Sequence, residues 1–138
     1  MKLLSWLAMG LATTLPIRGE VLINEIMYNP AQGERFEYVE LTNSGTVPVD
    51  LSGWAFTNGI EFTFPGGTLL EGGAYLIVSR SRDELLAAYP SVPPAAVLGD
   101  YEAQLNNGGE RLTLSNAAGD SVESLRYDDN PPWDFLAY

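Results

Sequence analysis

Carboxylates are the side chains of this sequence that could do chemistry, because its 138 residues include no histidine and no cysteine. Imidazole and thiol catalysis, Cys/His zinc sites and disulfide bonds are therefore excluded. The serines lack a histidine base and a nucleophile-elbow motif, and the glycine-rich turns do not follow the phosphate-binding loop pattern. A paired-carboxylate hydrolase needs two acids at a fixed separation, and a chain with 18 acids always offers such pairs. We assign no catalytic or cofactor-binding residue and predict that the protein is not an enzyme.

Two groups of acids are candidates for binding a metal ion. Glu25, Glu37 and Glu40 lie inside expected strands, where pairing of the strands would bring some of the carboxylates within cross-strand range. Asp128 and Asp129, followed by an asparagine, form a second oxygen-rich cluster. Calcium needs several converging oxygen ligands, and no loop here has EF-hand spacing. We therefore expect no metal, with a calcium-stabilised module as the weaker alternative.

Solvation or pairing with arginine is the favoured interpretation of the strand acids, since exposed strand faces commonly carry charge. Arg111 is the partner that we name for them. Arg80 and Arg82, at the start of an expected helix, are predicted to be solvated.

Residues 36–43 (FEYVELTN) are the stretch around which the chain is organised. Glu37, Val39, Leu41 and Asn43 fall on one face, and this period of two predicts a strand within a sheet. The following residues, Ser-Gly-Thr, end it with turn chemistry. Residues 21–27 are the preceding strand, which most simply pairs antiparallel with it, although a sandwich crossover would also fit.

An aromatic hairpin is predicted around Asn58-Gly59, a dipeptide favoured where both turn residues have positive φ. The flanking runs are residues 54–57 and 60–64. Their aromatic side chains are expected in the core, and an exposed platform for carbohydrate stacking is the minority alternative.

The second half of the chain adds strands and one short helix. Residues 74–79 read as a strand covered on both faces. Ser81 and Glu84 form a capping box for a helix that must stop before Pro90. Residues 111–115 and 121–127 are predicted to form a hairpin, with a bulge if Val122 and Leu125 are both buried. Seven or eight short strands with one helix and frequent turns predict an all-β sandwich.

Residues 1–19 have the pattern of a secretory signal peptide. Lys2 gives a positive start, residues 3–15 are apolar, and Gly19 is a small residue before the expected cleavage site. The apolar run is shorter than the roughly 20 residues of a membrane span, so an anchor is disfavoured. We predict a secreted or cell-surface protein that does not insert into the membrane after cleavage.

The chain after residue 19 is strongly acidic, with no lysine and five arginines against 18 acids. Such a surface repels phosphate backbones and anionic lipids, which argues against nucleic-acid binding. Solubility outside the cell is one explanation of the acidic surface, and cation binding is the more specific alternative.

Several motifs in order resemble the lamin tail domain of secreted bacterial proteins, over nearly all of residues 21–133. They are residues 22–26 (LINEI), 29–30 (NP), 36–43, 49–54 (VDLSGW), 64–68 (FPGGT), 72–78 (GGAYLIV), 88–90 (AYP), 105–112 (LNNGGERL) and 129–133 (DNPPW). The resemblance implies an immunoglobulin-like β-sandwich over residues 20–138 with no established catalytic residues. It also implies a binding or surface-attachment module, with a protein or a glycan on the cell surface as its partner.

The chain departs from that family pattern after Trp133, where the family continues into a final strand. We therefore expect a C-terminally truncated domain that lacks its last strand and is prone to aggregation because an edge is unpaired. Monodisperse behaviour with a cooperative melt would contradict this expectation. The alternative function that follows is an N-terminal accessory domain of a truncated secreted enzyme, either a hydrolase or a kinase-like protein.

Overall fold

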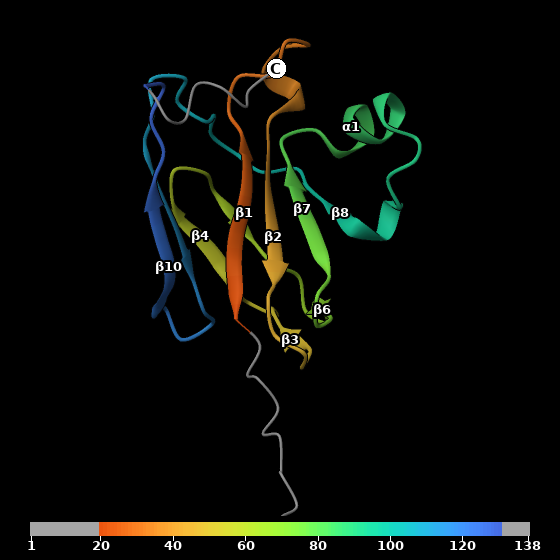
Figure 1. The fold of residues 1–138 in the computed structure, drawn as a ribbon, viewed down its shortest axis with the longest axis vertical. Coiled ribbons are helices and arrows are strands. Elements are labelled where there is room, and N and C mark those ends of the chain that lie inside the picture. The colour runs from red at the N-terminus through yellow and green to blue at the C-terminus, as the bar shows by residue number, and fades with distance from the viewer. Residues whose placement is uncertain (1–19, 131–138) are drawn as a thin grey trace, which may run out of the picture.

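Alternating apolar residues build the first of two sheets that face each other in the computed structural model, which describes residues 20–130 (Figure 1). Its strand order is β1-β2-β7-β8. The strands are β1 (Val21–Met27), β2 (Tyr38–Asn43), β7 (Tyr75–Ser79) and β8 (Val97–Leu98). The pairs β1–β2 and β2–β7 are antiparallel, as predicted for the first pair, whereas β7 and β8 are parallel.

The second sheet has the order β10-β9-β4-β5, and a two-stranded ribbon lies at one end of the sandwich (Figure 1). The strands of the second sheet are β4 (Ala55–Asn58), β5 (Phe62–Thr63), β9 (Arg111–Ser115) and β10 (Ser121–Arg126). The ribbon consists of β3 (Val49–Asp50) and β6 (Leu69–Leu70). The predicted all-β sandwich of immunoglobulin-like type is confirmed, although its strands are more numerous and several are only two residues long.

The core lies between the two sheets and is filled from the alternate positions of their strands. Val39 and Leu41 of β2 are fully buried, as are Leu112 and Leu114 of β9. The aromatic cluster is in the core as predicted: the ring of Phe64 lies 6.1 Å from that of Phe56 and 5.1 Å, edge-on, from that of Phe62. Burial of these side chains is the main driving force for bringing the sheets together.

The strand predicted over residues 36–43 begins two residues late. Glu34–Phe36 instead form a short 3₁₀ helix (η1), closed by the Phe36 N–H bonding to the Gly33 carbonyl and the Glu37 N–H bonding to that of Glu34. The predicted alternation nevertheless holds from Glu37 onward, because Glu37, Val39, Leu41 and Asn43 are all buried. The acid at position 37 therefore points into the protein.

The hairpin predicted at Asn58-Gly59 exists, but its turn is not a two-residue turn. Phe56 pairs with Phe62, and Asn58 belongs to β4, where it pairs with Thr113 of β9. Gly59 has a φ of 89°, whereas Asn58 does not share a positive φ. The pairing of β4 with β9 thus holds Asn58 in the strand and lengthens the loop.

Helix α1 (Arg82–Ala88) ends before Pro90 as predicted, but the capping box does not form. Ser81 makes no side-chain capping hydrogen bond. The Arg82 N–H instead donates to Oδ1 of Asp100, at 2.7 Å. A carboxylate from a distant loop thus satisfies one of the N–H groups that the first helical turn leaves without an intrahelical acceptor. A second 3₁₀ helix (η2, Pro94–Ala96) leads into β8.

The β9–β10 hairpin is confirmed, and its register shifts between Ser121 and Glu123 as the predicted bulge requires. Val122 is nevertheless 40% exposed, so the bulge does not serve to bury it.

The proposed signal peptide (residues 1–19) and the chain end after Trp133 lie outside the described residues. Within residues 20–130, no helix is long and apolar enough to cross a membrane.

Candidate functional site

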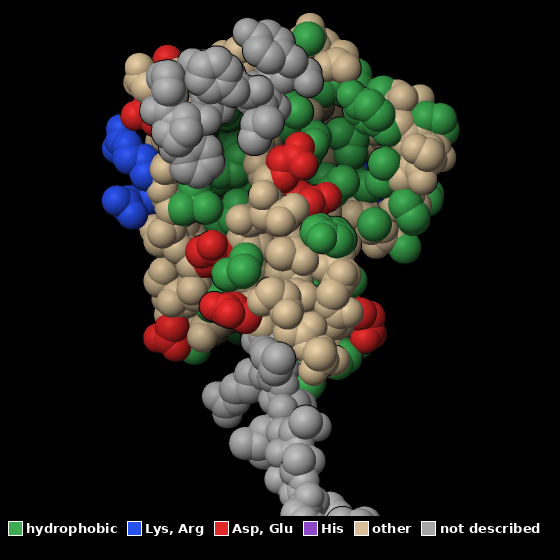
Figure 2. Space-filling view, in the orientation of Figure 1, with side chains coloured by type: hydrophobic (Ala, Val, Ile, Leu, Met, Phe, Trp, Pro, Cys, Tyr) green, Lys and Arg blue, Asp and Glu red, His purple; other side chains and the backbone are tan. Residues whose placement is uncertain are grey.

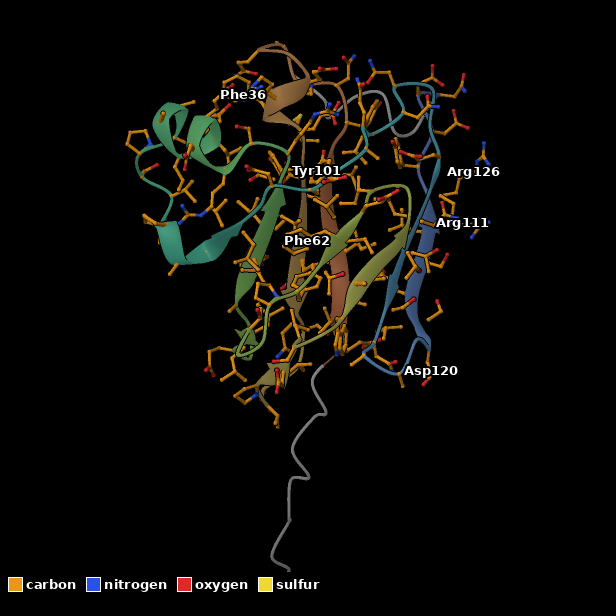
Figure 3. All side chains as sticks on the ribbon, turned by 180° about the vertical axis from the view of Figure 1, so that it is seen from behind. Phe36, Phe62, Tyr101, Arg111, Asp120 and Arg126 are labelled. Carbon is orange, nitrogen blue, oxygen red and sulfur yellow. The ribbon has the colours of Figure 1, made fainter. Side chains whose placement is uncertain are left out.

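Glu37 is the centre of a buried polar cluster. Its side chain is 1% exposed. Its Oε2 accepts a hydrogen bond from the Tyr101 hydroxyl at 3.0 Å and another from the Leu105 N–H at 3.1 Å. Both donors belong to the segment that crosses from β8 to β9, and Figure 3 shows Tyr101 in the interior. The carboxylate thereby fixes the crossing segment between the two sheets.

Arg80 is the charge partner of Glu37, so the prediction of Arg111 was wrong. A guanidinium nitrogen of Arg80 lies 3.6 Å from Oε2 of Glu37, and another lies 3.7 Å from Glu34. The Arg80 side chain also donates to the Ala103 carbonyl at 2.9 Å. Arg80 was expected to be solvated, but its position directly after β7 places it beside the start of β2. The general prediction that a strand acid pairs with an arginine is confirmed at Glu37.

Burial raises the pKa of Glu37 above its usual value. The Leu105 N–H, the Tyr101 hydroxyl and the Arg80 charge act in the opposite direction, but they do not fully offset the loss of hydration. Burial and the nearby carboxylate raise the pKa of Tyr101 as well, so its hydroxyl is a stable hydrogen-bond donor. The hydrogen bonds and the ion pair of this cluster stabilise the fold by connecting Glu37 with the crossing segment and with Arg80.

Glu25 and Glu40 are directly opposite each other on β1 and β2, which confirms that some of the strand acids meet across the sheet. Each accepts one hydrogen bond from a neighbour: Glu25 from the Tyr38 hydroxyl at 2.5 Å, and Glu40 from the Asn24 amide at 2.8 Å. Glu37 faces the other side of the sheet and does not join them. These exposed donors and the surrounding water offset the repulsion between the two carboxylates.

Asp128 and Asp129 form an acidic turn with Asn130. The Asn130 side chain donates to Oδ1 of both aspartates, at 2.5 and 3.1 Å, and its N–H donates to Asp128 at 3.1 Å. These hydrogen bonds lower the pKa of Asp128. Across the part of the chain that the structure describes, no three acids come together in a way that could hold a metal ion.

Glu123 is a second structural carboxylate, and the sequence reading did not single it out. It accepts a hydrogen bond from the N–H of Ile23, across the edge where β1 and β10 meet. Partial burial raises the pKa of Glu123, and this hydrogen bond works against that effect. The one available sequence signal was that Glu123 interrupts a strand pattern beside an expected bulge.

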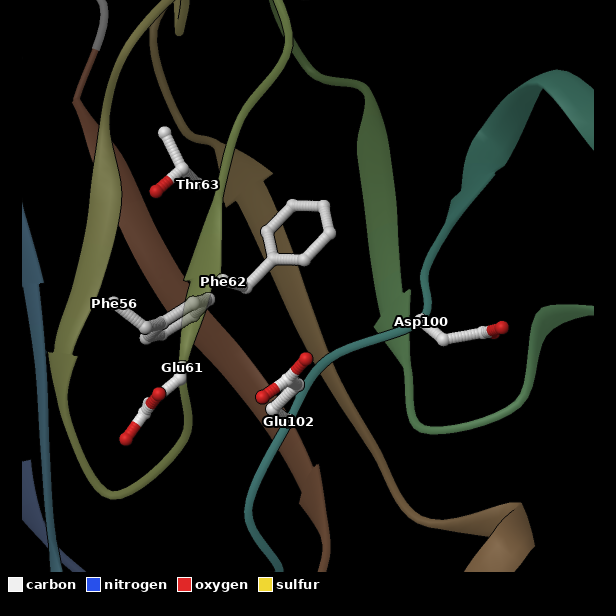
Figure 4. Close-up of a pocket in the computed structure, with 6 residues that line it drawn as sticks. All are labelled: Phe56, Glu61, Phe62, Thr63, Asp100 and Glu102. Carbon is white, nitrogen blue, oxygen red and sulfur yellow. The ribbon is translucent and has the colours of Figure 1, made fainter.

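An open pocket of about 430 Å³ lies beside β5 (Figure 4). Its lining residues are Phe56, Glu61, Phe62, Thr63, Asp100 and Glu102. Glu61 and Glu102 pair through their backbones, and both nitrogen-to-oxygen distances are 3.0 Å. The crossing segment therefore extends the second sheet at this point. The Asp100 side chain points away from the other lining residues because it binds the Arg82 N–H. None of the acids predicted from the sequence lines this pocket.

Comparison with protein families shows that the family model described as Lamin Tail Domain matches residues 16–129. Comparison with curated proteins gave no match. The matched range spans every strand described above.

Proposed function

The chain belongs to the lamin tail domain family, whose immunoglobulin-like members are generally non-catalytic modules, and on this premise we propose that it is a binding or surface-attachment module of a secreted bacterial protein. Its partner is a protein or a glycan on the cell surface. Attachment then depends on the outer faces and loops of the sandwich.

The observation that carries the proposal is the state of the five candidate acids. Each accepts a hydrogen bond from a neighbour within the domain: Glu37 in the core, Glu25 and Glu40 across β1–β2, and Asp128 and Asp129 in their turn. None of the five lines the pocket beside β5, from which a general acid or base would reach a bound substrate. These carboxylates stabilise the scaffold, and a scaffold with polar outer faces suits binding.

The experiment that tests the proposal measures attachment of the purified chain to bacterial envelopes. The labelled full chain is expected to bind saturably and to be displaced by unlabelled chain. An acidic protein of matched size and charge serves as the control. Binding no greater than that of the control would contradict the proposal, as would turnover of envelope polymers by the purified chain.

Secretion has a separate test. Mass spectrometry of the chain recovered from the culture medium is expected to give a mature N-terminus near Glu20. Retention of residues 1–19 on a chain found only inside cells would contradict the secreted location.

A further inference from the structure

Two arginines of this acidic protein stand directly opposite each other on the outer face of the second sheet. Arg111 of β9 and Arg126 of β10 are cross-strand partners, and both are exposed. Figure 3 shows both side chains projecting from the same side of the hairpin, and basic side chains lie together along that edge of the surface in Figure 2. Like charges placed directly opposite each other destabilise a sheet.

Neither guanidinium has a carboxylate partner among residues 20–130, unlike the other arginines of that range. Arg35 pairs with Glu84, and Arg80 pairs with Glu37 and Glu34. Arg82 pairs with Asp83 and also donates to two backbone carbonyls. Arg111 makes one long hydrogen bond, 3.3 Å to the Ser124 hydroxyl. Within residues 20–130, two positive charges thus have no paired carboxylate, in a protein of formal net charge −11.

Hydroxyl groups continue this surface along the two strands. Ser124 and Thr113 are the next cross-strand pair, and their hydroxyls lie 3.0 Å apart. Of the residues in β9 and β10, Glu123 alone carries a carboxylate, and it is turned to the Ile23 N–H at the β1 edge. We call the surface formed by Arg111, Thr113, Ser124 and Arg126 the arginine patch.

We infer that the arginine patch binds the carboxylate or sulfate groups of an acidic polysaccharide. Guanidinium groups bind planar anions through paired, charge-assisted hydrogen bonds, and an anion between the two arginines relieves their mutual repulsion. The adjacent hydroxyls can both donate to and accept from sugar hydroxyls. The inference rests on the proposed binding function and specifies the chemistry of its partner.

Charge and apolar content favour a polysaccharide over the other sources of an anion. The net negative charge of the whole protein repels a long, dense polyanion such as duplex DNA, whereas it tolerates anions that are spaced along a sugar chain. A protein partner would need an apolar centre in the interface. Of the large apolar side chains that are exposed within residues 20–130, only Val122 lies on β9 or β10.

The test is calorimetric titration of the full chain with polygalacturonate at low salt, with neutral dextran, duplex DNA and polyglutamate as comparison probes. Arg111→Gln with Arg126→Gln is expected to weaken polygalacturonate binding by about tenfold or more, since charge-assisted hydrogen bonds are lost. Arg35→Gln is the control for the single variants Arg111→Gln and Arg126→Gln, because each of the three removes one positive charge from an exposed arginine. Arg35 lies outside the patch, so its substitution should leave binding unchanged.

Thermal unfolding supplies a second readout that does not depend on measuring affinity. Without anions, Arg111→Gln alone is expected to leave the melting temperature unchanged or to raise it, because a like-charge pair is removed. Polygalacturonate is expected to raise the melting temperature of the wild-type chain, since a ligand that binds the folded state stabilises it. The double variant should lose this increase.

The inference is overturned by no binding to polygalacturonate, or by an equal loss of binding in the Arg35→Gln variant. Stronger, patch-dependent binding to DNA or polyglutamate also overturns it and identifies a different partner class. Attachment of the double variant to envelopes at wild-type level would refute the patch but leave the proposed function intact. If the wild-type chain fails to bind envelopes as well, both proposals are wrong.

Discussion

Two glutamates stabilise this sandwich by accepting a backbone N–H from a distant part of the chain, and they do so in different surroundings. Glu37 is 1% exposed and has three partners: the Leu105 N–H, the Tyr101 hydroxyl and the Arg80 guanidinium. Glu123 is half-buried at the edge between β1 and β10, where it accepts a hydrogen bond from the Ile23 N–H. In both, the loss of hydration raises the pKa of the carboxyl group.

The difference shows how the number of partners follows the depth of burial. A fully buried carboxylate loses nearly all of its water, so it is retained only where several donors and an opposite charge replace that water. A half-buried carboxylate keeps part of its hydration and therefore needs fewer hydrogen-bond donors from the protein. Removing the two side chains should therefore have unequal effects.

The largest effect is expected for Glu37→Ala. The change leaves the Leu105 N–H and the Tyr101 hydroxyl without an acceptor in the core and leaves Arg80 without its buried partner. We expect the free energy of unfolding to fall by about 3 kcal/mol. Urea denaturation measures it, with Glu37→Gln as the matched variant, which keeps one acceptor oxygen and should lose less. A loss no larger than that of Glu123→Ala would remove the distinction between the two glutamates.

A smaller loss is expected for Glu123→Ala, about 1 kcal/mol, because water can reach the Ile23 N–H at the edge of the sheet. The same urea experiment measures it. Glu61→Ala is the control, since it removes an exposed carboxylate from a residue that pairs with Glu102 through its backbone. If Glu61→Ala and Glu123→Ala destabilise equally, general charge rather than the hydrogen bond to Ile23 explains the loss.

The pH dependence of stability should also distinguish these glutamates from the exposed aspartates. The folded-state pKa values of Glu37 and Glu123 are raised above the ordinary value of 4.5. Between 4.5 and the raised pKa, the folded chain therefore binds more protons than the unfolded chain. Their contribution to stability therefore increases as the pH falls from neutral towards 4.5 and is lost as the pH rises through the folded pKa. Hydrogen bonds from Ser52 lower the pKa of Asp50, as those from Asn130 lower the pKa of Asp128. The contribution of these two aspartates to stability declines as the pH falls below about 3.8.

We expect maximal stability on the mildly acidic side, with a change smaller than that of either alanine substitution. Urea denaturation at several pH values between neutral and 4.5 measures it. The double variant Glu37→Gln, Glu123→Gln should show a flatter dependence of stability on pH. Repulsion among the other acids falls equally in both chains at low pH, so the difference between their profiles reports the two glutamates. An identical profile in the two chains would contradict the assignment.

The smallest effect is expected from calcium. Glu25 and Glu40 each accept a hydrogen bond from a neighbour, and the described residues hold no group of three acids arranged for a metal. Addition of millimolar calcium or of a chelator should therefore shift the melting temperature by no more than about 1 °C. A calcium-dependent increase of several degrees, abolished in Glu40→Gln, would instead support the calcium-stabilised alternative.

Local patterns predicted the elements whose residues interact with near neighbours. Alternation located β1, most of β2 and the β9–β10 hairpin, and Pro90 marked the end of α1. The same alternation contained the signal for Glu37, because it shares a face with Val39 and Leu41. The order of the motifs also identified the family.

Predictions failed where contacts between residues far apart in the sequence decided the outcome. Ser81 makes no capping hydrogen bond at α1, whereas Asp100, 18 residues from Arg82, accepts the Arg82 N–H. Asn58 is drawn into β4 by pairing with Thr113. Arg80, and not Arg111, reaches Glu37, since the ends of β2 and β7 are adjacent in the sheet.

The amino-acid sequence by itself determined the sandwich class, the residues available for its core and the strongly acidic, lysine-free character of residues 20–130. These properties depend on residue type and on spacing along a strand, which are local. Only the tertiary structure decided which carboxylates are buried with partners and which arginines lack them. Tyr101 lies 64 residues from Glu37, and Glu123 lies 100 residues from Ile23, so their pairing depends on how the two sheets pack. The exposed pair of Arg111 and Arg126 likewise follows from the register of β9 and β10, which no single strand specifies.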